Sequence, residues 1–147
     1  MKLHVVSIFL LILVSVISSC GTSATPGPSS APVTIQDQAS LINALQAVGA
    51  TVETGDSITQ EFFTPEGQTV KVNGADLQVF EYESAEAMEK EASQVAPDGG
   101  SIGTSMVTWM APPHFYKAGR IIALYVGDDK PLLDLLNKVI GSQFAGQ

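Results

Sequence analysis

TVKVNGADLQVFEY, residues 69–82, is the stretch of the chain from which the fold is most directly predicted. Apolar and polar residues alternate on both sides of Asn73-Gly74, which is the pattern of half-buried strands. Asn and Gly tolerate the positive φ that a tight turn between antiparallel strands requires. The sequence therefore predicts a β-hairpin with strands over 69–72 and 76–82.

A segment on the N-terminal side of this hairpin predicts a helix over about 36–48. Its leucine, isoleucine and valine residues recur at helical spacing on one face. Thr34 and Asp37 have the spacing of a capping box, and Gly49 suits a left-handed stop.

Two more helices are predicted on the C-terminal side of the hairpin. One begins after Ser84 as its N-cap and ends before Pro97. The other begins near Asp129, has Pro131 in its first turn and ends at Gly141.

Shorter segments predict the remaining strands. Residues 50–53 follow the first helix, and Phe62-Phe63 suits a short edge strand. Residues 105–110 and 120–126 are expected to pair with each other, with Pro112-Pro113 in their connection. This order predicts an α+β fold, a two-layer sandwich in which an antiparallel sheet carries about three helices on one face. A ferredoxin-like topology is one arrangement consistent with it.

The first twenty residues have the layout of a secretory signal. A charged start at Lys2 precedes an apolar run over 5–17, and the small residues Ser18 and Ser19 lie before Cys20. The alternative is an uncleaved membrane anchor, but a spanning helix needs about 20 apolar residues and this run is shorter.

Ile17-Ser18-Ser19-Cys20 resembles the lipobox of bacterial lipoproteins. The resemblance implies cleavage between Ser19 and Cys20 and attachment of a diacylglyceryl group to the Cys20 sulfur, which anchors the protein to a membrane. It also implies a location in the cell envelope on the extracytoplasmic side. That means the outer membrane in a Gram-negative cell, because Gly21 rather than Asp follows the cysteine, or the outer face of the cell membrane in a Gram-positive one.

The rest of the chain divides into a tether and one domain. Residues 20–32 contain the cysteine and then Pro, Gly, Ser, Thr and Ala without charge, a composition typical of a disordered linker. With residues 1–19 as the signal peptide, residues 33–147 are left as a single globular domain.

Composition excludes several function classes. The 147 residues hold 7 Lys and Arg against 15 Asp and Glu, a net charge of -8, and loss of Lys2 with the signal leaves -9. Such a chain lacks the basic surface that nucleic-acid binding requires. One cysteine and two histidines provide neither a disulfide framework nor a Cys/His zinc site, so no metal or other cofactor is predicted.

Several residue groups are candidates for a catalytic or binding site. His114 is the single histidine after the signal, and no G-x-S-x-G motif accompanies it. Asp128-Asp129 suits helix capping better than metal binding, and the glycine-rich segment 97–103 suits a turn better than a phosphate cradle. The acidic residues over 81–89 suit a solvated face better than the paired carboxylates of a glycosidase.

Residues 109–117, WMAPPHFYK, are the least ordinary segment, because three aromatic residues surround a double proline. One interpretation places Trp109, His114, Tyr116 and Arg120 in a recognition patch, with Arg120 available for a carboxylate or phosphate. The alternative is that the aromatic residues fill the core.

The domain is similar to small uncharacterised bacterial lipoproteins that carry a QVFEY strand and a PPHFY…GR…LYVGDD stretch, here residues 78–82 and 112–129. This resemblance implies the domain boundaries and no activity.

The expected function is therefore non-enzymatic binding of a small ligand or a protein outside the cytoplasmic membrane. One alternative is an exported hydrolase with His114 as general base, which requires a Ser, Thr, Asp or Glu side chain within about 3.2 Å of its ring. Another is a purely structural envelope protein, which requires a buried Trp109. Partial exposure of Trp109 or Tyr116 favours binding.

Overall fold

The computed structural model describes residues 34–147. The predictions for residues 1–33, including cleavage at Ser19, lipidation of Cys20 and the tether, lie outside the described residues. The helices are α1 (Gln38–Ala47), α2 (Ala85–Ala92) and α3 (Lys130–Val139). The strands are β1 (Val52–Ile58), β2 (Gly67–Val72), β3 (Ala75–Glu81), β4 (Ser101–Ile102), β5 (Ser105–Met106), β6 (Pro113–Ala118), β7 (Ile121–Val126) and β8 (Ala145–Gly146).

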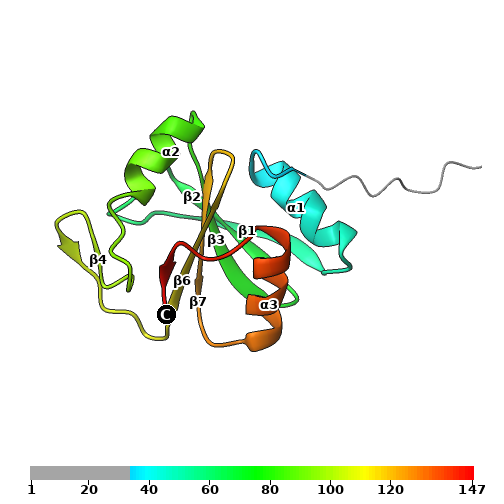
Figure 1. The fold of residues 1–147 in the computed structure, drawn as a ribbon. Helices are drawn as coiled ribbons and strands as arrows, with labels where there is room; N and C mark the ends of the chain where they lie inside the picture. Colours follow the sequence, from blue (N-terminus) through cyan, green and yellow to red (C-terminus); the bar gives the residue numbers. More distant parts are fainter. Residues whose placement is uncertain (1–33) are drawn as a thin grey trace, which may run out of the picture. The chain divides into compact units, whose positions relative to one another are not determined.

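Six of the strands form one antiparallel sheet in the order β1-β2-β3-β7-β6-β8. The predicted hairpin is confirmed as β2 and β3, with Val72 opposite Ala75 and positive φ at both Asn73 and Gly74. β4 and β5 form a separate small hairpin that stands out from the sheet in Figure 1.

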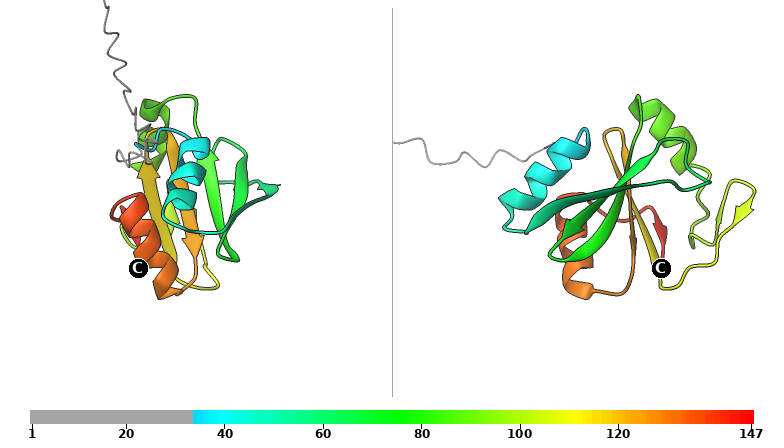
Figure 2. Two further views of the ribbon diagram at one scale, coloured as in Figure 1. Left: turned by 90° about the vertical axis from the view of Figure 1, so that its right-hand side faces the viewer. Right: turned by 180° about the vertical axis from the view of Figure 1, so that it is seen from behind.

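The helices lie on both faces of this sheet. In Figure 1 and in the right-hand view of Figure 2, α1 and α3 lie on one side of the strands, and α2 and the β4–β5 hairpin lie on the other. The side chains form two cores accordingly. The core under α1 and α3 includes Leu41, Leu45, Val70, Leu77, Ile121 and Leu136. The core under α2 includes Phe63, Phe80, Met88, Phe115, Ile122 and Leu124.

The α+β class, the antiparallel sheet and the three helices are confirmed. The distribution of the helices differs from the expected arrangement on one face, because β7 is apolar at every position and buries both of its faces. The connectivity is not ferredoxin-like, since β1, β2 and β3 are consecutive neighbours and β7 lies between β3 and β6.

The helix ends are set by local hydrogen bonds. Ser84 and Asp129 are the N-caps of α2 and α3, as predicted. The N-cap of α1 is Asp37, whose partner in the capping box is Ser40 rather than Thr34. α2 ends at Ala92, before Pro97 as predicted, and the chain then turns back so that Val95 forms a bridge with Ile102 of β4.

Two strand predictions are wrong. Residues 105–110 do not pair with β7; Ser105 and Met106 pair with β4, and the partner of β7 is β6, which begins at Pro113. A proline is tolerated there because it is the first residue of its strand. Phe62 and Phe63 lie in a turn, where the ring of Phe63 packs 4.8 Å from that of Phe80.

Candidate functional site

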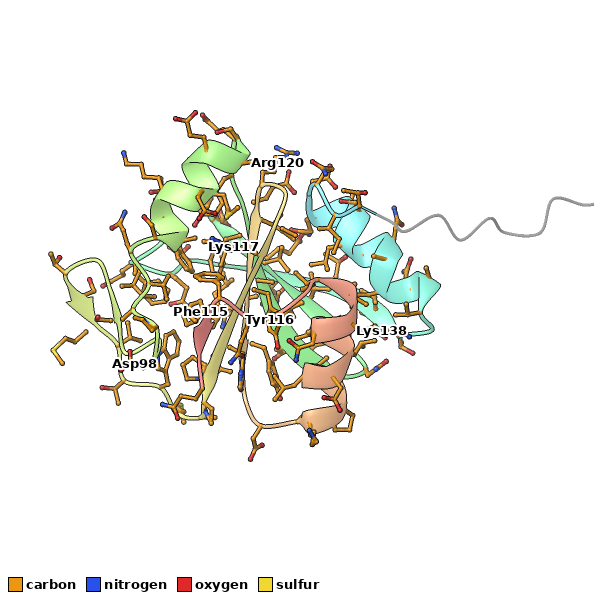
Figure 3. All side chains as sticks on the ribbon, in the orientation of Figure 1. Asp98, Phe115, Tyr116, Lys117, Arg120 and Lys138 are labelled. Carbon is orange, nitrogen blue, oxygen red and sulfur yellow. The ribbon has the colours of Figure 1, made fainter. Side chains whose placement is uncertain are left out.

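The four residues of the predicted recognition patch do not form one surface. Side chains alternate along β6, so that His114 and Tyr116 face α3 while Phe115 faces the opposite core. In Figure 3, Phe115 and Tyr116 extend to opposite sides of β6, and Arg120 lies at the upper end of the sheet. Trp109 packs on Phe115. The structure therefore pairs His114 with Tyr116 and separates both from Trp109 and Arg120.

The side chain and backbone of Arg120 make bonds within the fold. Its guanidinium lies 2.6 Å from a Glu81 carboxylate oxygen and donates to the Tyr82 carbonyl at 3.2 Å. Its backbone N–H donates to the Gln36 carbonyl at 2.9 Å. These bonds tie the chain before α1 to the β6–β7 turn, which leaves the cation committed to structure.

His114 is buried, with 5% of its surface exposed. Its Nδ1 lies 2.7 Å from Gln143 Oε1, its Nε2 lies 3.0 Å from the Gly127 carbonyl oxygen, and its ring stacks on Tyr125. Within residues 34–147, no Ser, Thr, Asp or Glu side chain hydrogen-bonds to this ring. The neighbour that the hydrolase alternative requires is therefore not among its partners.

Tyr116 is fully buried, and its hydroxyl has no hydrogen-bonding partner among the described residues. Burial raises the pKa of Tyr116, so the phenol stays neutral. Tyr116 and His114 line a cavity of about 280 Å³ between β6, α3 and the segment that follows α3. We refer to it as the α3 cavity; its other lining residues include Lys130, Asp134, Asn137 and Gln143.

Trp109 is half-buried, and two fully exposed methionines lie one and three positions from it in the sequence. Its indole packs edge-on against Phe62 and Phe115 at 5.9 and 5.8 Å, and its Nε1–H donates to the Gly99 carbonyl at 2.7 Å. Met106 and Met110 are 92% and 102% exposed. We call Met106, Trp109 and Met110 the hairpin surface.

A second cavity, of about 480 Å³, lies between α2 and the end of β3. Two of its three carboxylates are engaged within the fold: Glu91 accepts from the Tyr82 hydroxyl at 2.8 Å, and Glu81 pairs with Arg120, whereas Glu83 is exposed. Burial and the Glu91 carboxylate raise the pKa of Tyr82 strongly. The other acidic side chains near this helix, at Glu83, Glu86 and Glu89, are exposed, which agrees with a solvated face.

The remaining sequence candidates have structural roles. Asp129 caps α3 by accepting from the Leu132 N–H at 3.3 Å, and Asp98 accepts from the Gly100 N–H within a turn. Within residues 34–147, no three His, Cys, Asp or Glu side chains lie close enough to hold a metal ion. In the same part of the chain, every helix is too short or too polar to span a bilayer.

The sequence pointed to Trp109, His114 and Tyr116 but missed their neighbours. Asn137 and Gln143 line the α3 cavity, but the sequence around each of them is that of ordinary surface residues. Exposure of Met106 and Met110 was also missed, because residues 105–110 were predicted to be a strand of the main sheet. Gly103 could have indicated the turn of the β4–β5 hairpin, since glycine favours the positive φ that it adopts there.

No protein-family model, curated protein or solved structure matches this chain. Its function is therefore inferred from its own residues.

Proposed function

We propose that this chain is a lipid-anchored extracytoplasmic protein whose domain binds another protein through the hairpin surface. Residues 17–20 supply the lipobox-like anchor signal, and residues 21–32 supply an uncharged tether. The observation that carries the binding role is the exposure of two methionines, at 92% and 102%, beside a half-buried tryptophan.

Physical chemistry supports contact with a partner at this surface. When a partner covers large apolar side chains that are fully exposed to water, the free energy of the system falls by about 25 cal/mol per Å² of buried apolar surface. Methionine adapts its flexible thioether to differently shaped partners, and tryptophan is enriched among residues that dominate binding energy. The contacts of Trp109 with Phe62 and Phe115 fix the loop that carries Met110, which lowers the entropy lost on binding.

The partner is a protein with an apolar groove and a basic rim. A net charge of -9 on the chain after residue 19 attracts a basic protein surface and is repelled by anionic lipid. A purely structural spacer needs no such exposed apolar surface. The hydrolase alternative requires a Ser, Thr, Asp or Glu side chain bonded to His114, and among residues 34–147 the ring bonds to Gln143 and Gly127 instead.

The anchor is tested with Cys20→Ala in the full-length chain. We expect this variant to be lost from the membrane fraction, whereas the wild-type protein stays there after alkaline washing. Quantitative retention of the variant after the same washing would overturn the anchor.

The binding surface is tested by photo-crosslinking in the native envelope followed by direct binding of the purified partner. Met106→Asp/Met110→Asp should weaken binding of that partner at least about tenfold, a change of about 1.4 kcal/mol. Val48→Asp is the matched control, since Val48 is also exposed, at 41%, but lies at the end of α1. Equal loss in the control, or methionine-dependent binding to phosphatidylcholine vesicles in place of a protein, would contradict the proposal.

A further inference from the structure

The α3 cavity contains two buried polar side chains in unequal states. Both ring nitrogens of His114 have partners, at 2.7 Å in Gln143 and 3.0 Å in Gly127. The hydroxyl of Tyr116 has none among residues 34–147, although the residue is fully buried. A buried hydroxyl without a partner is costly, and such groups in native proteins usually meet a water or ligand.

The lining indicates which chemistry would meet that hydroxyl. Lys130 and Asp134 lie on the rim 3.8 Å apart and offset each other's charge. Asn137, Ser142 and Gln143 add neutral donors and acceptors, and Leu133 is the aliphatic member. A wall that both donates and accepts without net charge suits hydroxyl groups, each of which does both.

The size of the cavity sets the size of the ligand. Sites for drug-sized molecules are usually about 300–1,000 Å³, and this cavity is about 280 Å³. We infer that the α3 cavity binds a small neutral polyhydroxylated molecule, of the size of one sugar ring, whose hydroxyl groups bond to Tyr116 and the polar side chains of α3.

The Tyr116 hydroxyl has almost no accessible surface, so a ligand in the α3 cavity reaches it only when a neighbouring side chain moves. The cavity is separate from the hairpin surface, so the two sites are independent.

The test is a titration of the full-length protein with glucose, galactose and N-acetylglucosamine. Binding is monitored by NMR through the chemical shifts of the backbone amides. We expect at least one of these sugars to shift the amides of Asn137, Ser142 and Gln143 together. Tyr116→Phe should weaken that binding about tenfold. Tyr82→Phe is the matched control, because it also removes one buried tyrosine hydroxyl but lies outside the α3 cavity and should bind as wild type.

Three results would overturn the inference. They are no shifts at saturating sugar, equal sugar affinity of wild type and Tyr116→Phe, or stronger binding of sodium acetate than of any sugar. Met106→Asp/Met110→Asp should keep sugar binding, so failure here is distinguishable from failure of the hairpin surface.

Discussion

Removal of the Tyr116 hydroxyl is expected to stabilise the domain. The phenol is fully buried, its hydroxyl has no partner among the described residues, and it lies beside the α3 cavity. Tyr116→Phe keeps the ring and its packing while it removes the unsatisfied group. Most core substitutions destabilise proteins, so a gain at this position is a distinctive outcome.

The expected magnitude follows from the cost of an unsatisfied buried polar group, about 1–3 kcal/mol. A small loss is subtracted for the space that the oxygen filled. We expect the free energy of unfolding to rise by about 1 kcal/mol. For a domain of this size, that raises the Tm by about 4 °C.

Tyr82→Phe is the matched control in the same assay. Tyr82 is also buried, but its hydroxyl donates to the Glu91 carboxylate at 2.8 Å. Loss of a hydrogen bond to a charged group costs about 1.5 kcal/mol or more, so this variant should be destabilised. Urea denaturation and thermal scans of the two variants measure effects of opposite sign.

The dependence of the free energy of unfolding on pH in the alkaline range provides a second measurement. Burial raises the pKa of both phenols in the folded state, so the stability of the wild-type protein is unaffected by their ionisation below a pH of about 10 and falls as the pH rises further and the phenols of the unfolded chain ionise. Each Phe variant should therefore lose less stability above about pH 10 than wild type. Destabilisation of Tyr116→Phe at neutral pH would refute the reasoning, because it would mean that the hydroxyl already has a partner in the purified protein.

Two further predictions concern the chain around α1. Gly119→Ala should destabilise more than twice as much as Gly74→Ala. Both positions have positive φ, which costs about 1–2 kcal/mol with a side chain, but a Cβ at Gly119 would clash with the Gln36 backbone, while one at Gly74 meets no atom of residues 34–147 within 4 Å. Equal urea midpoints for the two variants would contradict this. Hydrogen bonds from Ser40 lower the pKa of Asp37, so its contribution is present above about pH 4 and lost as the pH falls below it. Asp37→Asn keeps a capping oxygen and should show a shallower loss of stability than wild type in acid; parallel acid profiles would argue against a role for that carboxylate.

Local signals predicted several local features correctly, although not the cap of α1, where Asp37 takes the place expected for Thr34. The Asn73-Gly74 turn, the caps Ser84 and Asp129 and the apolar face of α3 each depend on residues a few positions apart. These preferences operate within a single turn or helix, so they are readable from the sequence alone.

The pairing of distant strands was not readable in the same way. The sequence predicted residues 105–110 as the partner of residues 120–126, whereas the structure pairs β7 with β6, which begins at Pro113. The choice depends on which pairing buries both faces of β7, where Ile121 and Leu124 belong to different cores. That free energy arises only once α2 and α3 are in place on opposite faces.

The candidate sites show the same division. The sequence by itself identified Trp109, His114, Tyr116 and Arg120 as chemically notable, and its lipobox-like segment predicts where the protein is held. Only the tertiary structure decided that Arg120 is engaged by Glu81, that Met106 and Met110 are exposed, and that the buried Tyr116 hydroxyl has no partner among residues 34–147. The physical reason is that residue type fixes which bonds a side chain can make, whereas its neighbours in space fix which of them are made.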